Sequence, residues 1–189
     1  MLKMLSTFIH PTEGSITVAG HDAVSSPLAV RHNIGYLSGD TPLYQEMRVD
    51  KFLRFIAEAR GLSGNEMEQS LAKTINLCSL DSVLKQRVKE CSTGFRQRIG
   101  LATALVHDPP VLLLDEPTHG FDPMQVLAFR DTLRSLRENR AILFSTHITR
   151  TTTISSICSS TTCCHCRRNR RITFMLQSNP SRFQSRDIT

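Results

Sequence analysis

The stretch VLLLDEPTHGFDP, from Val111 to Pro123, carries the clearest structural signal in this 189-residue chain. Its apolar run leads directly into two adjacent carboxylates, Asp115 and Glu116. A continuous apolar run is typical of a strand that is buried on both faces of a parallel sheet. Two neighbouring carboxylates at the end of such a strand repel each other and resist desolvation. The stretch therefore predicts a site for a cation, or for a proton that has to be moved.

The segments around this stretch predict an α/β fold. Apolar runs at 34–38 and 141–147 predict two further buried strands, and the alternating residues at 14–20 predict a short strand bounded by glycines. Between these runs the apolar residues recur with helical spacing. The predicted helices cover 27–33, 48–61, 65–80, 81–92, 93–110 and 123–139. A strand, a helix and a strand joined by short links form a βαβ unit, which implies a parallel sheet.

The excess of positive charge lies entirely at the C-terminal end of the chain. The net charge is +6, and residues 149–189 contain seven Arg and one acidic residue. The remaining 148 residues are neutral, with 16 basic and 16 acidic side chains. A neutral body argues against a specific nucleic-acid-binding protein, although non-specific contact between the Arg-rich end and phosphates stays open as an alternative.

Residues 149–189 read as an aberrant, disordered tail. They are rich in Ser, Thr, Cys and Arg, and they show neither a helical nor a strand period. Because the change falls inside a predicted fold unit, we favour loss of the reading frame near Ile148 over a natural disordered appendix. The run CCHC at 163–166 lacks the gaps that let four ligands converge, so we expect no zinc site there.

Three polar side chains are expected together at the carboxyl edge of the predicted sheet. Asp115 ends one buried strand, Glu116 follows it, and His147 ends another. Ligands bind at this edge in α/β proteins, and Mg²⁺ is usually held there through one or two carboxylates together with phosphate oxygens. Asp115 suits that role, and Glu116 could accept a proton from water. Taken singly these are weak signals, because a strand-end Asp is as easily a helix cap and a lone His is more often structural.

Together with CSTGFRQR upstream (Cys91–Arg98), these residues resemble the ATP-binding subunits of ABC transporters. VLLLDEPTHGFDP resembles the Walker B motif and D-loop of that family, CSTGFRQR its signature motif, and ILFSTH its switch-histidine strand. PTEGSITVAGHD and IGYLSGDTPLY follow the family's order and spacing. The resemblance covers residues 1–147, and within bacteria it is greatest to ABC-2-type exporters, including the sodium-export branch.

The resemblance implies a P-loop NTPase-like α/β domain over 1–148, with a parallel sheet and an inserted α-helical subdomain at about 41–92. It implies ATP and Mg²⁺ as cofactors, a transmembrane permease as a partner, and a peripheral cytoplasmic position at the inner face of the membrane. Asp115 would hold Mg²⁺ through water, Glu116 would be the general base, and His147 would sense the γ-phosphate.

The second implied partner is another nucleotide-binding domain, in a head-to-tail dimer. Ser92, Thr93 and Gly94 would contact the nucleotide of that domain, since they open a helix whose backbone N–H groups and dipole suit phosphate. Asp122 would be the D-loop aspartate at the same interface.

The chain also departs from the family pattern. The signature motif, usually Leu-Ser-Gly-Gly-Gln, reads Cys-Ser-Thr-Gly-Phe from Cys91 to Phe95, and Gly39 stands at the Q-loop glutamine position. No G-x-x-x-x-G-K-[S/T] phosphate loop occurs in the 189 residues, and MLKMLSTF resembles the helix that normally follows it. We therefore expect a domain incomplete at both ends, truncated before the Walker A loop, and unable to hydrolyse ATP alone. The alternative is a non-catalytic ABC-like fragment, either a regulatory partner or a decayed gene product.

Overall fold

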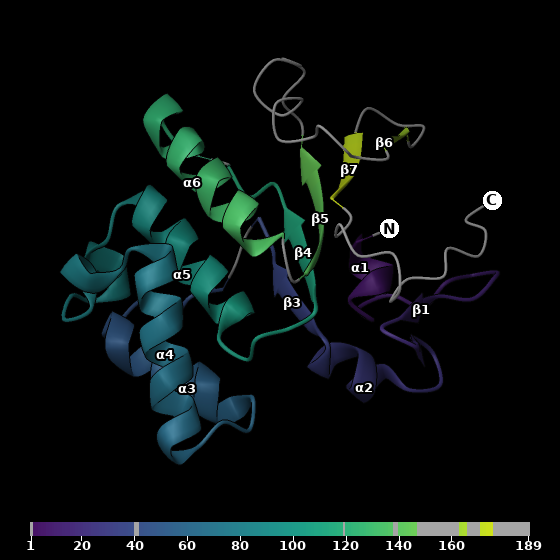
Figure 1. Cartoon of the computed structure of the whole chain (residues 1–189), viewed down its shortest axis with the longest axis horizontal. Coiled ribbons are helices and arrows are strands. Elements are labelled where there is room, and N and C mark those ends of the chain that lie inside the picture. The colour runs from purple at the N-terminus through teal and green to yellow at the C-terminus, as the bar shows by residue number, and fades with distance from the viewer. Residues whose placement is uncertain are drawn as a thin grey trace.

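The fold is organised around one five-stranded sheet with the strand order β3-β4-β5-β7-β6 (Figure 1). The computed structural model describes residues 2–39, 42–118, 120–137, 140–146, 163–165 and 171–175. The strands are β3 (Ile34–Leu37), β4 (Val111–Asp115), β5 (Ala141–Thr146), β6 (Cys163–His165) and β7 (Arg171–Met175). β3, β4 and β5 run parallel, whereas β7 runs antiparallel to both of its neighbours.

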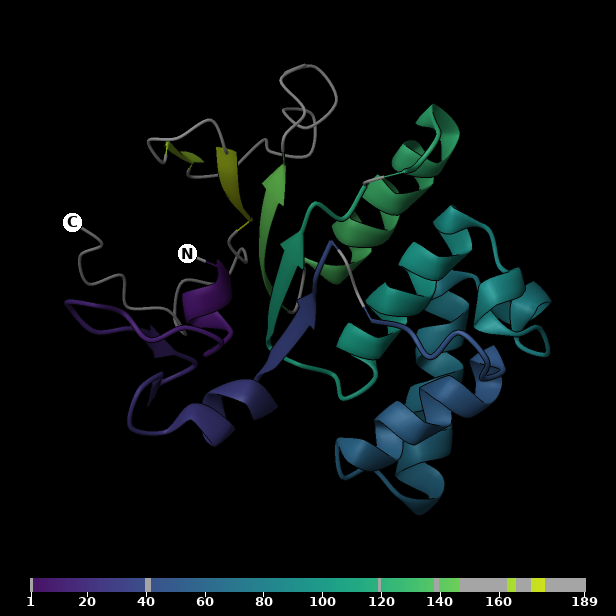
Figure 2. The ribbon, with the colours of Figure 1, turned by 180° about the vertical axis from the view of Figure 1, so that it is seen from behind.

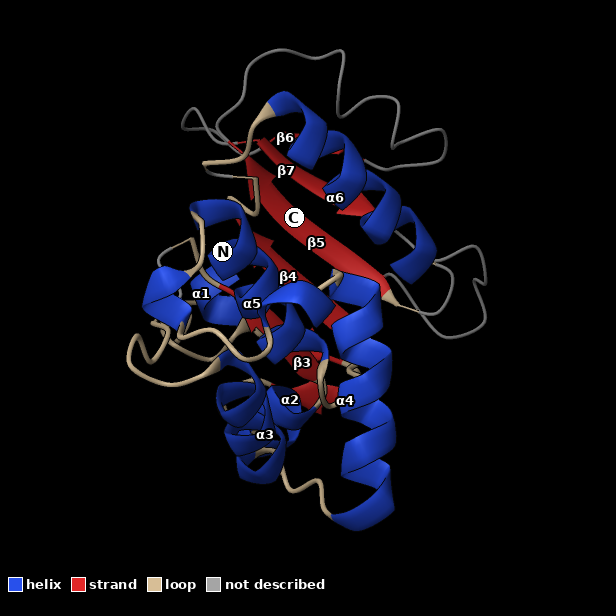
Figure 3. Ribbon diagram, turned by 90° about the vertical axis from the view of Figure 1, so that its left-hand side faces the viewer, coloured by secondary structure: helices blue, strands red, loops and turns tan. Residues whose placement is uncertain are grey.

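The parallel strands confirm the predicted βαβ organisation. Helix α5 (Thr93–Leu105) precedes β4, and α6 (Pro123–Leu136) connects β4 to β5. β3 comes earlier in the chain and pairs with the other side of β4. Figure 3 shows the strands side by side, with helices packed over the sheet. Because the three parallel strands point the same way, their carboxyl ends share one edge of the sheet.

Alternate side chains along β4 enter two separate hydrophobic clusters. Leu112 and Leu114 pack in the larger cluster, together with α3, α4, α5 and α6. Val111 and Leu113 pack in the smaller cluster, together with α1, α2 and β1. The remaining elements are α1 (Leu2–Leu5), β1 (Thr17–Val18), β2 (His21–Asp22), α2 (Pro27–His32), α3 (Val49–Ala59) and α4 (Gly64–Cys78). Figures 1 and 2 show the two groups on opposite sides of the sheet, which is therefore buried on both faces, as its apolar run predicts.

Helices α3 and α4 form where the helical spacing predicts them. α3 buries Phe52 and Leu53, and it ends before Gly61, whose φ of 86° is a backbone angle that favours glycine. Both helices pack in the same hydrophobic cluster as one face of the sheet, and the division into a separate helical subdomain at 41–92 stays a prediction. Within the described ranges, no helix combines the length and the apolar character needed to cross a bilayer.

The prediction of a single helix at 81–92 is wrong. The structure has two short 3-10 helices there, η1 (Asp81–Val83) and η2 (Val88–Glu90). Between them the Gln86 carbonyl accepts a hydrogen bond from the Val49 backbone N–H at 3.0 Å, at the start of α3. Because this carbonyl is engaged outside its own segment, it does not join the ladder of a continuous helix.

Residues 149–189 contain β6 and β7, although the sequence predicts no regular structure there. β7 pairs with β5, with Phe174 opposite Leu143. Ile172, Thr173 and Phe174 are β-branched or aromatic, which favours a strand along an open sheet edge. A strand this short shows no period of its own, so the pattern misses it. The other residues of 149–189 lie outside the described ones, and the disordered tail proposed for them stays a prediction.

Candidate functional site

The end of β4 is held to the end of β5 by a hydrogen bond between side chains. The parallel register places Asp115 opposite Ser145. The Ser145 hydroxyl donates to Oδ1 of Asp115, and Ser145 is only 4% exposed. A buried hydrogen bond of this kind restricts the carboxylate to one orientation, since water does not readily replace the donor.

Glu116 is held in an unusual backbone conformation directly after β4. Its φ is 50°, in the left-handed region, which costs a residue other than glycine about 1–2 kcal/mol. Its backbone N–H donates both to the Ser145 carbonyl oxygen at 3.2 Å and to the Ser145 hydroxyl at 3.3 Å. These two acceptors help to maintain the turn that ends the strand at this carboxylate.

The end of β3 lies against the same two carboxylate residues. A Cβ atom added at Gly39 would lie 3.4 Å from the Asp115 carbonyl oxygen and 3.9 Å from the Glu116 Cβ. Burial, and then the nearby Asp115 carboxylate, raise the pKa of the Tyr36 phenol. The glycine at the Q-loop position is therefore next to both carboxylate residues. Three strands thus meet at the carboxyl edge that the sequence predicts as the ligand site.

His147, the third predicted residue at this edge, lies outside the described residues. β5 ends at Thr146, the residue before it, so the strand that leads to His147 is present as predicted. The role assigned to His147 stays a prediction.

The signature segment opens α5. The Ser92 hydroxyl accepts a hydrogen bond from the Phe95 backbone N–H at 3.3 Å, which makes Ser92 the N-cap of a 13-residue helix. Ser92 and Thr93 are exposed, whereas Gly94 is buried. The exposed start of a helix carries backbone N–H groups and partial positive charge, which suit an anionic ligand.

The start of α6 packs directly on this helix start. Asp122 caps α6 by accepting from the Gln125 backbone N–H at 2.8 Å, and the Gln125 side chain accepts in turn from the Asp122 backbone N–H at 3.3 Å. A Cβ atom added at Gly94 would lie 2.7 Å from Oε1 of Gln125, so a larger residue there would force the end of the Gln125 side chain to move. Likewise, a Cβ atom at Gly120 would lie 2.8 Å from Cγ2 of Thr93. The predicted signature and D-loop residues therefore form one contiguous unit.

Sequence reasoning missed three residues that hold these groups in place. Ser145 lies in the quoted ILFSTH strand, but a strand serine gives no signal of its own until the register with β4 is known. Gln125 stands three residues after Asp122, which is the capping-box spacing and could have been recognised. Gly120 precedes Phe121 and Asp122 in a turn, where a glycine with φ of 76° is a common feature.

The donor set at the sheet edge fits Mg²⁺ that arrives with a phosphate ligand. Among the residues that the structure describes, no group of three or more His, Cys, Asp or Glu could hold a metal ion. Mg²⁺ retains several waters and is commonly bound by one or two carboxylates plus phosphate oxygens. Asp115, with one carboxylate oxygen fixed by Ser145, meets that requirement, whereas a resident protein cage would need more ligands.

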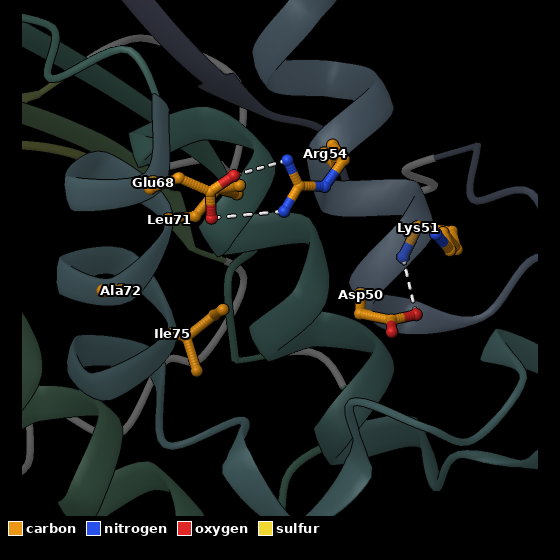
Figure 4. A pocket seen from close by; sticks show the side chains of 7 residues that line it. All are labelled: Asp50, Lys51, Arg54, Glu68, Leu71, Ala72 and Ile75. Carbon is orange, nitrogen blue, oxygen red and sulfur yellow. Dashed lines mark hydrogen bonds and ion pairs between the residues drawn. The ribbon is translucent and has the colours of Figure 1, made fainter. Parts of the chain in front are cut away.

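A separate pocket of about 250 Å³ lies between α3 and α4. Figure 4 shows Arg54 of α3 reaching Glu68 of α4, with N–O distances of 2.5 and 3.2 Å. Both side chains are well exposed, so this ion pair adds little stability. None of the predicted site residues lines the pocket, and it is not a candidate for the nucleotide.

Comparison with known proteins identifies the family. The family model for the ABC transporter matches residues 1–119. The chain is 35% identical over 167 residues to the ABC transporter ATP-binding protein NatA of Bacillus subtilis, covering 87% of this chain and 67% of NatA. It is 34% identical over 147 residues to the uncharacterized ABC transporter ATP-binding protein YxlF of the same organism, covering 78% of this chain but only 48% of YxlF.

Solved structures agree in fold. The ATP-binding subunit of an ABC transporter superimposes with a TM-score of 0.69 at 28% identity, covering 79% of this chain and 63% of that chain. The ABC transporter cassette MJ0796, solved as a dimer, superimposes with a TM-score of 0.65 at 18% identity, covering 76% of this chain and 73% of that chain. Both solved structures share the α/β fold of this chain. The chain belongs to the family of ABC transporter ATP-binding proteins and has the fold of an ABC ATPase.

Proposed function

We propose that this chain is the ATPase subunit of an ABC exporter, coupling ATP hydrolysis to transport through a membrane permease. The observation that carries the proposal is the buried hydrogen bond from Ser145 to Asp115 beside Glu116, at the carboxyl edge of the sheet. In phosphoryl transfer the protein contributes mainly position and charge. This edge offers the Asp115 carboxylate, oriented by Ser145, beside Glu116, whose backbone N–H is bonded to the same serine. The chain spans about two thirds of NatA and half of YxlF, so the activity of the whole protein is part of the proposal.

Each residue at the sheet edge has its own role in the proposed reaction. Mg²⁺, when bound with ATP, neutralises charge on the phosphates and orients them. Asp115 would hold that ion through water, with the carboxylate that Ser145 orients. Glu116 accepts the proton of the attacking water. His147 donates a hydrogen bond to the terminal phosphate as negative charge develops on it.

The start of α5 serves the nucleotide of a second domain. Ser92 and Thr93 are exposed at a helix start, and Asp122 is exposed at the start of α6 beside them. The proposed assembly is a head-to-tail pair of nucleotide-binding domains, bound through the permease to the cytoplasmic face of the membrane. The dimer solved for MJ0796 supports this arrangement by similarity of fold.

The packing of the α5 and α6 starts favours a second candidate function. Ser92 and Asp122 are exposed there, and Gly94 lies against the Gln125 side chain beside Asp122. The second candidate is a non-catalytic ABC-like subunit that caps the nucleotide of a partner domain with Ser92, Gly94 and Asp122.

Phosphate release by Glu116→Gln tests the two candidates. The ATPase proposal requires that the chain, paired head to tail, release phosphate from ATP, although the sequence predicts no hydrolysis by a single chain. Glu116→Gln should then lower that rate by about 10²- to 10⁴-fold while leaving ATP binding intact. Glu58→Gln is the matched control, since Glu58 is an exposed carboxylate on α3. Equal rates for Glu116→Gln and the wild type would overturn the ATPase proposal. A wild type that releases no phosphate, yet stimulates a catalytic partner domain, would establish the capping function instead.

A further inference from the structure

We propose that Ser145 is a positioning residue for the Asp115 carboxylate and for the backbone of Glu116, and that its hydroxyl sets how tightly Mg²⁺ is held. This inference rests on the proposed function, because it assigns Mg²⁺–ATP to the carboxyl edge of the sheet. Ser145 acts through Asp115 and Glu116 and does not itself touch the reacting atoms.

A single buried hydroxyl serves both carboxylate residues. Its proton is donated to Oδ1 of Asp115, and its oxygen accepts the Glu116 backbone N–H at 3.3 Å. A serine hydroxyl has one donor and two acceptor positions, so both contacts can be made at once. The same N–H also reaches the Ser145 carbonyl oxygen at 3.2 Å, which means that two of the three contacts depend on the side chain.

The register of the sheet makes this arrangement specific to residue 145. In the β4–β5 ladder Leu114 is opposite Phe144, and Asp115 is opposite Ser145. Both Leu114 and Phe144 belong to the larger hydrophobic cluster. Ser145 is thus the first polar residue along β5, directly after an apolar pair, and its exposed fraction is still only 4%. Loss of its hydroxyl would remove a buried hydrogen-bond donor from Asp115, and water would not readily take its place.

Loss of each of the two contacts has a different expected effect, so the two effects can be measured independently. Loss of the contact to Oδ1 frees the Asp115 carboxylate to rotate, so a Mg²⁺ shell is held less well. Loss of the contact to the Glu116 N–H leaves that amide with one acceptor in place of two. Ser145→Ala removes both contacts, whereas Ser145→Thr retains the hydroxyl and suits a strand.

The first measurement is amide hydrogen exchange of the full chain by NMR, without nucleotide. We expect Ser145→Ala to speed exchange at the Glu116 amide roughly five- to tenfold and Ser145→Thr to restore it. The control is Ser135→Ala, which removes an exposed hydroxyl from α6. An unchanged Glu116 amide, or an equal acceleration along the whole of β4, would overturn the positioning role, because the second result marks general loosening of the sheet.

The second measurement is the Mg²⁺ concentration that gives the half-maximal rate of phosphate release. We expect Ser145→Ala to raise it several-fold at saturating ATP and Ser145→Thr to return it towards the wild-type value. A lower maximal rate with an unchanged Mg²⁺ requirement overturns the inference, since a merely structural role gives that result. If the wild type releases no phosphate, the ATPase proposal itself has failed, and the exchange at Glu116 alone decides whether Ser145 positions the carboxylate residues.

Discussion

Replacing Gly35 by Ala should separate β3 from α5. An added Cβ would lie 2.1 Å from the Ala104 carbonyl oxygen and 2.9 Å from Cγ of Pro109. Ordinary contacts of a Cβ atom begin at 3.4 Å, so the strand and the helix must move apart by about 1.3 Å. The obstacle is backbone, which cannot swing aside as a long side chain can. Overpacking of a core costs about 1–3 kcal/mol, and this case belongs at the upper end of that range.

We therefore expect Gly35→Ala to lower the free energy of unfolding by about 3 kcal/mol. For a chain of this size that corresponds to a fall of about 6–12 °C in the midpoint of thermal unfolding. Urea unfolding followed by far-UV circular dichroism measures the change. Gly39→Ala is the matched control, because its Cβ would meet its nearest neighbour at 3.4 Å, an ordinary contact. If Gly35→Ala unfolds within about 0.5 kcal/mol of the control, the close approach of β3 to α5 is refuted.

Three further changes have distinct expected results. Burial, and then the Arg60 charge, lower the pKa of His107 from 6.5 to about 4, so the unfolded chain binds this proton more readily than the folded one. The contribution of neutral His107 to the free energy of unfolding is therefore fully present above pH 6.5. It is lost as the pH falls towards 4, which lowers that free energy by about 2 kcal/mol after allowance for partial exposure. Urea midpoints on either side of that window should show the loss, and His107→Gln should reduce it. Asp122→Ala should cost about 1 kcal/mol by removing the cap of α6, with Asp122→Asn retaining most of the stability in the same assay. Leu112→Ala should cost about 2–5 kcal/mol, because Leu112 is fully buried in β4, and a change below about 1 kcal/mol would contradict its place in the core.

Elements with strong hydrophobic patterns were predictable from the sequence. The apolar run of β4 requires burial on both faces, and α3 places Phe52 and Leu53 at helical spacing, so each pattern has one structural solution. The segment 81–92 has a helical pattern too, but its backbone groups bond to the start of α3, and such distant partners leave no trace in the local pattern. β7 was missed for a related reason, since a five-residue strand depends on the edge of β5 for its partners.

The candidate site was predictable in its carboxylates and in the start of α5, but not in the residues that orient them. Asp115 and Glu116 are conspicuous because two adjacent carboxylates at the end of a buried strand repel each other and resist desolvation. Ser145 and Gln125 are ordinary residues whose importance comes from contacts across the fold, to Asp115 and Gly94 respectively. A motif therefore identifies the groups that carry the chemistry, whereas the groups that orient them become visible only through strand register and packing.

The left-handed backbone of Glu116 has a consequence for how this sequence can change. At a φ of 50°, glycine or asparagine would relieve strain that a glutamate must bear. Random substitution followed by selection for thermal stability alone should therefore discard this carboxylate, while selection for turnover should retain it. The role proposed for Glu116 therefore comes at the expense of the stability of the folded chain, because a glutamate at this φ bears strain that a glycine would not.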